Sequence, residues 1–174
     1  MMEQYDIIFP AYGFRKHKGY GTREHMDKLR LNKACVIHRK SFKPVASAMP
    51  TLSWLRKEDG IGQWGEQTAA VYLVERGYEI VAMNVHCDPY GEIDIIAEKD
   101  GIIIFVEVKT YSKKQLGTPA QNIDQNKLKK LEAAIHKYVV DMKVKKDIFL
   151  DVICVYLKPS IPMFEHFKGI RLEA

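Results

Sequence analysis

The stretch GEIDIIAEKDGIIIFVEVKT, residues 91–110, decides the fold. It holds two runs rich in β-branched residues, joined at Asp100-Gly101, a dipeptide that favours a two-residue hairpin turn. Counting outward from that turn places Asp94 opposite Glu107 and Glu92 opposite Lys109. Because side chains alternate across a strand, these four residues share one face of the hairpin. The other face is apolar and is expected to pack on a helix; it takes Ile93, Ile95, Ile104, Val106 and Val108.

Two carboxylates opposed on neighbouring strands repel each other. Their side chains lie ~5 Å apart, which corresponds to roughly 3 kcal/mol at an effective dielectric of ~20. A raised carboxylate pKa, a neighbouring lysine or a bridging divalent cation can offset this repulsion. Lys109 supplies the neighbouring lysine, and the opposed carboxylates suit a bridging divalent cation.

A carboxylate pair beside a lysine has the groups that metal-assisted phosphodiester hydrolysis needs. Mg²⁺ prefers hard oxygen ligands, polarises phosphate oxygens and lowers the pKa of a bound water. Lys109 would orient that water or stabilise the charge that develops on the phosphate. Glu66 is a candidate fourth member, because it places a carboxylate beside an apolar helical stripe, where charges are rare without a partner.

Each of these residues also has an ordinary structural interpretation. Asp94 and Glu107 would then be solvated carboxylates, Lys109 a partner of Glu92, and Glu66 a residue at a helix edge. Lys127 and its neighbouring lysines would form a solvated helix face, although one of them would be placed to contact backbone phosphate. The functional interpretation rests on the occurrence of all these residues together, because the ordinary structural interpretations must hold for every one of them at once.

The segments around the hairpin predict an α/β fold. Helical spacing of apolar residues indicates helices over 61–76 and 124–142, and β-rich runs indicate strands over 78–85, 148–156 and 163–167. Gly117-Thr118-Pro119 marks a loop. The expected order is one helix, three strands, one helix and two strands.

Composition separates the first third of the chain from the rest. The 174 residues are 47% hydrophobic and 28% charged, as in a folded globular protein. Residues 1–52 hold ten Lys/Arg and four Asp/Glu, whereas residues 53–174 hold 17 and 18. Aromatic rings lie among the basic residues, a pattern typical of nucleic-acid contacts and also of a solvated tail. Three scattered cysteines, no basic leader and no long apolar run predict a cytoplasmic protein with no membrane span.

The stretch FPAYGFRKHKGYGT, followed by EHMDKL and HRKSFKPV, resembles the C-terminal part of bacterial type 2 ribonuclease H over about residues 4–45. The resemblance implies contacts to an RNA–DNA hybrid, with Tyr20 at the junction sugar. Lys16, Lys18 and Arg39 are candidate nucleic-acid contacts because they are basic residues that lie among aromatic rings. That family's metal-binding carboxylates lie upstream of the matched part, so no ribonuclease H activity is expected unless another polypeptide supplies them. The helix expected over 22–31 would be loosely held, because a single helix buries little surface.

Residues of about 57–168 resemble the YraN-like proteins, through the motifs GEQTAAVYLVERGYEIVAMN, GEIDIIAEKDG, FVEVKT and NKLKKLEAA. That group is similar to archaeal Holliday-junction resolvases and restriction-endonuclease-like nucleases. The resemblance implies Asp94, Glu107 and Glu66 as metal ligands and Lys109 as the catalytic lysine. The sequence departs from the family at Tyr111, where a basic residue is usual, and in VHCDPY before Gly91.

The sequence therefore predicts a restriction-endonuclease-like core over 57–174, a ribonuclease H-like segment over 1–46 that is loosely ordered, and a linker over 47–56. The expected function is metal-dependent cleavage of DNA, more than RNA, with Mg²⁺ or Mn²⁺. A non-catalytic nucleic-acid-binding protein and a hybrid-binding part of a split ribonuclease H are the alternatives. A homodimer is expected if the substrate is a junction, because two symmetric cuts need two sites.

Overall fold

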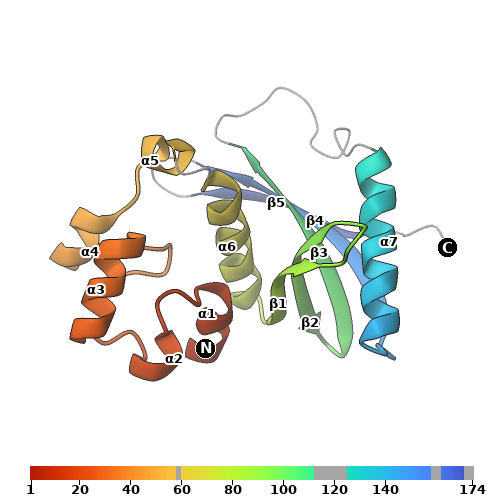
Figure 1. Ribbon diagram of the computed structural model, residues 1–174, viewed down its shortest axis with the longest axis horizontal. Coiled ribbons are helices and arrows are strands. Elements are labelled where there is room, and N and C mark those ends of the chain that lie inside the picture. The colour runs from red at the N-terminus through yellow and green to blue at the C-terminus, as the bar shows by residue number, and fades with distance from the viewer. Residues whose placement is uncertain (58–59, 112–124, 158–161, 171–174) are drawn as a thin grey trace.

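The computed structural model describes residues 1–57, 60–111, 125–157 and 162–170, and shows a five-stranded mixed sheet in the order β1-β2-β3-β4-β5. Strands β3 and β4 are parallel and the other neighbours antiparallel, so the helix between β3 and β4 provides the crossover that parallel strands need. This arrangement confirms the predicted fold class (Figure 1). The elements are α6 Ile61–Val74, β1 Glu79–His86, β2 Glu92–Lys99, β3 Ile102–Tyr111, α7 Gln125–Asp141, β4 Ile148–Tyr156 and β5 Met163–Ile170. The loop predicted at 117–119 lies outside the described residues.

The β2–β3 hairpin has the predicted register. Asp100 and Gly101 both have positive φ, 53° and 79°, as a type I′ turn requires. Cα pairs run from Lys99–Ile102 to Ile95–Val106. Beyond that pair the amide of Val108 donates to Asp94 Oδ2 (2.6 Å).

The β2–β3 ladder ends at Ile95–Val106, so neither predicted pair, Asp94 with Glu107 or Glu92 with Lys109, belongs to it. Glu92 pairs instead with His86 of β1, and its Oε2 lies 3.8 Å from His86 Nδ1. Ile93 also lies beyond the ladder. It joins the apolar cluster that includes Cys87 and Leu131, not the cluster of Ile95.

Helices cover both faces of the sheet. Helix α6 lies on one face and α7 on the other (Figure 1). The α6 face buries Ile95, Ile104, Val106 and Val108, as the alternation predicts. The α7 face buries Phe105 against Leu131 and Ile135, so the carboxylate face of the hairpin is not an open surface.

The first third of the chain is helical and packs on this core. Helices α1 Met2–Ile8 and α6 are in contact, and α1 also contacts β1. Gln4 joins α1 to the sheet, because its side-chain amide accepts from the backbone N–H of Ile80 and donates to the carbonyl of Ile80. Phe9 is buried in the same cluster as Ile95. The other helices are α2 Phe14–His17, α3 Arg23–Asn32, α4 Lys43–Ala48 and α5 Leu52–Lys57.

Helix α3 corresponds to the helix predicted over 22–31, and it packs against neighbouring elements. It contacts α4, and Leu29 is buried with Ala34 and Val45. The segment predicted as a linker holds the end of α4 and most of α5. The division of the chain into domains, and the loose ordering of residues 1–46, stay predictions.

Gly65 lets α6 approach the sheet closely. A Cβ added at this position would lie 1.8 Å from Thr110 Oγ1 and 2.8 Å from Thr110 Cβ, distances that real atoms do not tolerate. The contact therefore fixes the position of α6 against β3. Gly62, one turn earlier, has only Glu66 Oε1 near it, at 3.8 Å.

We predict that Gly65→Ala lowers the free energy of unfolding by about 1–3 kcal/mol, because the helix must move away from β3. Gly62→Ala, the matched control, is expected to be neutral or stabilising, because alanine has the higher helix propensity. Urea unfolding of Gly65→Ala, Gly62→Ala, Thr110→Ala and the Gly65→Ala/Thr110→Ala double variant measures the coupling between residues 65 and 110. Equal effects of Gly65→Ala and Gly62→Ala would contradict the role of this contact.

Three imidazoles form one hydrogen-bonded chain in the first third. His17 Nε2 lies 2.9 Å from the carbonyl of Tyr12, which can only accept, so this nitrogen carries the hydrogen. His17 Nδ1 then accepts from His25 Nδ1 (3.2 Å), and His25 Nε2 accepts from His38 Nε2 (3.1 Å). The amide of Cys35 donates to His38 Nδ1 (3.0 Å) and closes the chain. Each of these hydrogen bonds then has one donor and one acceptor, and an added proton on His25 or His38 would set two N–H groups against each other.

We predict that acid destabilises this part of the protein. Burial, with the neighbouring imidazoles, lowers the pKa of His25, and it lowers the pKa of His38 to about 4. Because the unfolded value is ~6.5, the unfolded chain binds more protons between about pH 6.5 and 4, so stability is lost as the pH falls through this window.

Denaturant unfolding of His38→Gln from pH 7.5 to 4.5 tests this expectation. The variant is expected to be less stable than the wild type at pH 7.5 and to depend less on pH below 6.5. His136→Gln, at an exposed position of α7, is the control and should match the wild type. An unchanged pH dependence in His38→Gln would show that the imidazole chain does not titrate as described.

Candidate active site

Glu107 is the centre of the candidate site. It lies on β3, on the face that α7 covers, and its side chain is 4% exposed. Its Oε1 accepts from Lys109 Nζ (2.7 Å), two residues along the same strand, and from Lys127 Nζ on α7. A carboxylate this buried requires such partners, because removing an ion from water costs several kcal/mol.

Asp94 lies next to this group on β2 and carries the most perturbed carboxyl of the site. Burial, together with the negative charge of Glu107, raises the pKa of Asp94 to about 7. The hydrogen bond from the amide of Val108 and the ammonium of Lys127 act in the opposite direction. The predicted repulsion between Asp94 and Glu107 is therefore present, and a raised pKa and neighbouring lysines both offset it.

Lys127 is closer to the site than its predicted role as a phosphate contact implies. Its side chain is 51% exposed, so it reaches from solvent to the buried Glu107 carboxylate. Burial alone would lower the pKa of Lys127, but the hydrogen bond and charge of Glu107 raise it, so the ammonium stays charged. Its position on α7 gave no sequence signal for this contact, because the hairpin and the helix meet only in the folded chain.

Glu66 stands on α6, near the site but with a partner of its own. Its Oε2 accepts from Asn84 Nδ2 (2.9 Å), and Asn84 has a positive φ of 52° on β1. The charge of Glu66 still contributes to the raised pKa of Asp94. The expectation that Glu66 needs a partner is met by Asn84.

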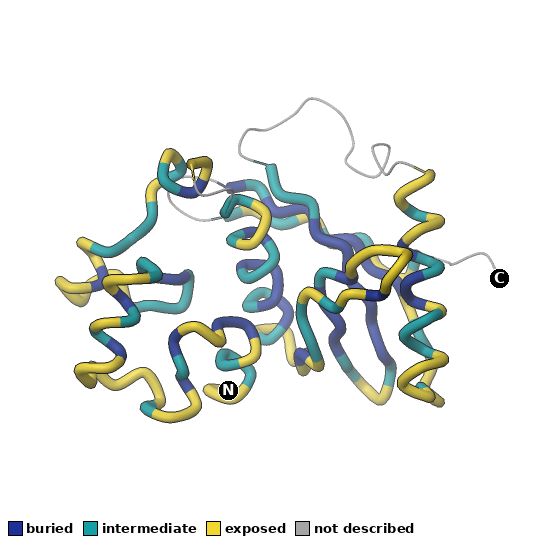
Figure 2. The backbone as a smooth tube through the Cα atoms, in the orientation of Figure 1, coloured by how far each residue is buried: buried dark blue, intermediate teal, exposed yellow. Residues whose placement is uncertain are grey.

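The basic candidates of the first third lie elsewhere. Helices α1 to α4 are on the side of α6 that faces away from α7 (Figure 1). Figure 2 shows this part as exposed along much of its outer side. Lys16, Lys18 and Arg39 are exposed, and Tyr20 is 74% exposed. The structure therefore does not bring these four residues to the carboxylate site, and their role in nucleic-acid binding stays a prediction.

The donors at the site suit a hard divalent cation in their chemistry. Mg²⁺ keeps several waters and is held by one or two carboxylates. Asp94 and Glu107 are ligands of this kind. Within the described part of the chain, no group of three or more His, Cys, Asp or Glu side chains is arranged to hold a metal ion. The predicted three-ligand set that includes Glu66 is therefore not assembled in this structure.

The sheet, its two covering helices and the carboxylate–lysine cluster define an α/β protein compatible with the restriction-endonuclease-like fold. The chain matches the model of a family described as uncharacterised protein family UPF0102 over residues 65–155, and it belongs to that family. The matched region contains every residue of the carboxylate site, whereas the basic candidates of the first third lie outside it.

Three relatives named as UPF0102 proteins each match more than half of this chain and most of their own length. The protein of Herpetosiphon aurantiacus is 32% identical over 118 residues, which is 65% of this chain and 94% of the relative. That of Syntrophomonas wolfei is 35% identical over 107 residues, 61% and 92% of the two chains. That of Campylobacter fetus is 40% identical over 99 residues, 57% and 86%.

These matches support the resemblance to the YraN-like proteins and give no support to the ribonuclease H resemblance of residues 4–45. No helix among the described residues is long and apolar enough to span a bilayer. The cytoplasmic location stays a prediction.

We predict that Asp94→Asn stabilises the metal-free protein increasingly as the pH rises from 4 to 7. With its folded pKa raised from 3.8 to about 7, the native state binds more protons than the unfolded state in this window. The contribution of Asp94 to wild-type stability therefore falls as the pH rises, by up to about 4 kcal/mol, and asparagine does not titrate. Denaturant unfolding in EDTA measures the difference, with Asp147→Asn, an exposed aspartate, as the control. A difference that does not change with pH would contradict the raised pKa.

Proposed function

We propose that this protein is a metal-dependent endonuclease that hydrolyses phosphodiester bonds in DNA. The observation that supports the proposal most is the grouping of Asp94, Glu107 and Lys109 on two neighbouring strands, with Lys127 added from α7. A buried carboxyl group whose pKa is raised by burial and by a specific charged neighbour is a candidate for a functional site, and Asp94 is such a group.

Each residue has a role that follows from its position. Asp94 and Glu107 would hold Mg²⁺ or Mn²⁺, which when bound supplies polarisation of the phosphate and a more acidic water. Lys109 keeps its ammonium at the Glu107 carboxylate, where it can also donate to a phosphate oxygen. Lys127 reaches the same carboxylate from the exposed side, so it is the cation that an incoming phosphate group meets first.

A non-catalytic nucleic-acid-binding protein is the second candidate. One observation favours it: two ammonium groups already neutralise Glu107, so the cluster can be stable without a metal. The two candidates differ in whether a divalent ion is needed and whether DNA is cut. The RNA–DNA hybrid-binding alternative would require a separate catalytic core.

We predict that the purified chain cleaves DNA in Mn²⁺ or Mg²⁺ and not in EDTA, tested on single-stranded, duplex and four-way-junction DNA. Lys109→Ala and Glu107→Gln are expected to reduce the cleavage rate by about 100-fold or more, as loss of a transition-state contact does. Lys130→Ala, at an exposed position of α7, is the matched control. Cleavage that survives Glu107→Gln at the wild-type rate would remove the site assignment, and metal-independent binding without cleavage would favour the second candidate.

A further inference from the structure

A cavity of about 510 Å³ opens in the first third of the chain, far along the sequence from the carboxylate site. Its size is in the range of small-molecule sites. Its walls combine aromatic and apolar side chains with two cations, and they include no Asp or Glu of the described chain. The main lining residues are Phe14, Lys18, Met26, Arg39, Phe42 and Val45.

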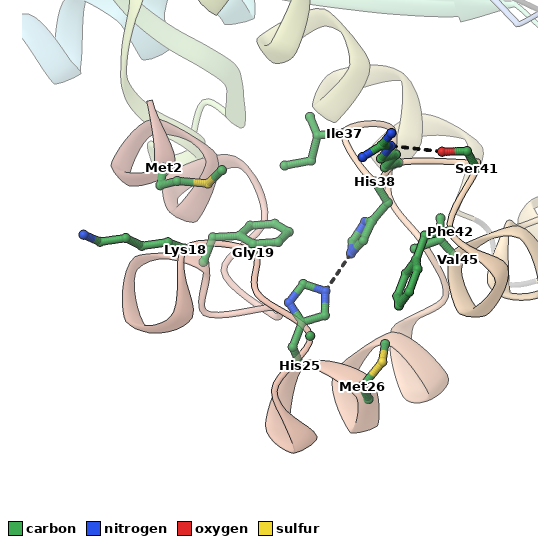
Figure 3. Close-up of a pocket in the computed structure, with 13 residues that line it drawn as sticks. Met2, Lys18, Gly19, His25, Met26, Ile37, His38, Ser41, Phe42 and Val45 are labelled. Carbon is green, nitrogen blue, oxygen red and sulfur yellow. Dashed lines mark hydrogen bonds between the residues drawn. The ribbon is translucent and has the colours of Figure 1, made fainter.

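The floor of the cavity offers ring surfaces and not hydrogen bonds. His25 and His38 face each other there, joined by the hydrogen bond drawn in Figure 3. The imidazole chain that starts at Tyr12 and ends at Cys35 uses all the ring nitrogens of these two residues. A ligand that enters the cavity therefore meets neutral, planar groups and gains by van der Waals contact and stacking.

One side of the cavity is formed by a tight turn. The amide of Phe42 donates to the carbonyl of Arg39 (3.0 Å), so the two side chains come from the ends of a single turn. Phe42 leaves 48% of its surface exposed, which is a high value for an aromatic ring. Arg39 Nε donates to Ser41 Oγ (3.0 Å), which orients the guanidinium, and among the described residues its terminal N–H groups have no hydrogen-bond partner.

Lys18 lies on the side of the cavity opposite Phe42, with its ammonium pointing outward (Figure 3). The lining residues Gly19 and Gly21 flank Tyr20, whose ring is 74% exposed. A second exposed aromatic therefore stands beside the same opening. The mouth combines stacking groups with positive charge, whereas the interior is apolar.

We propose that this cavity binds one unpaired nucleotide, with its base against the rings and its phosphate at Arg39. A flat, unsaturated body with an anionic end matches a ring-lined interior and a mouth that carries only positive charge. The inference rests on the proposed function, because it names the substrate class as a nucleic acid with an unpaired base. It does not depend on cleavage, since the cavity shares no residue with the carboxylate site.

The test uses the full chain and duplex DNA that carries one bulged 2-aminopurine, with a fully paired 2-aminopurine duplex for comparison. We expect the fluorescence of the bulged base to change on binding, and the paired base to respond weakly. Phe42→Ala is expected to weaken binding of the bulged duplex roughly 5- to 100-fold, as loss of one stacking ring does. Arg39→Gln is expected to weaken binding and to lower the salt slope by about one.

Lys40→Gln is the matched control, because Lys40 belongs to the same turn but lines a different cavity. It is expected to leave the 2-aminopurine response intact. Phe42→Leu, which keeps the apolar volume, is measured beside Phe42→Ala in case the alanine variant does not fold, as judged by circular dichroism. Competition by adenosine 5′-monophosphate would show that the cavity binds a free nucleotide. No competition, together with a 2-aminopurine response that depends on Phe42, would show that the flanking strand is required.

Binding in Phe42→Ala, Phe42→Leu and Arg39→Gln that equals that of Lys40→Gln would overturn the proposal. Lys109→Ala separates this result from a failure of the proposed function, because it should lose cleavage and keep the 2-aminopurine response. A protein that never cleaves DNA but binds the bulge through Phe42 would leave the cavity assignment standing and remove the endonuclease proposal.

Discussion

The Glu107 carboxylate, buried and shared by two ammonium groups, is the interaction on which the arrangement of the site depends. It lies on the central strand β3, which pairs with β2 on one side and with β4 on the other. Lys109 comes from the same strand and Lys127 from the crossover helix α7. Because a buried carboxylate is unfavourable without its cations, the ion cluster links β3 to α7 at the place where the helix begins.

Asp94 makes the cluster more than a buried salt bridge. Two lysines are enough to pair with the carboxylate of Glu107. A second carboxyl group, which burial keeps near neutral, adds no stability to the fold. Replacing buried ionic groups by apolar ones is often neutral or stabilising, so stability alone does not explain the pair. A cation that binds both carboxylates would turn the unfavourable repulsion into affinity, with loss of the Asp94 proton on binding. The second carboxyl group is therefore better explained by the proposed metal site than by the stability of the fold.

Sequence reasoning predicted what local chemistry determines. Asp100-Gly101 defines a turn and hence a register, which placed Asp94 near Glu107, and the helical and strand periods located α6, α7 and all five strands. It failed where contacts join distant segments. Lys127 meets Glu107 only across the fold, and α1 is a seven-residue helix that depends on its contacts with β1 and α6. The imidazole chain links residues 8 and 13 positions apart, a spacing with no periodic signal.

Helix α6 connects the two parts of the molecule that carry candidate sites. Gly65 places the helix against Thr110, the residue after Lys109, while Glu66 on the next position contributes to the field at Asp94.

The buried side of the first third packs on the same helix and shares its apolar core through Ile8 and Phe9. Removing the first third would therefore expose this core and disturb the helix that stands beside the carboxylate site. Point substitutions at Phe42 and Arg39 avoid that coupling, because both side chains lie at the mouth of the cavity and not in the shared core.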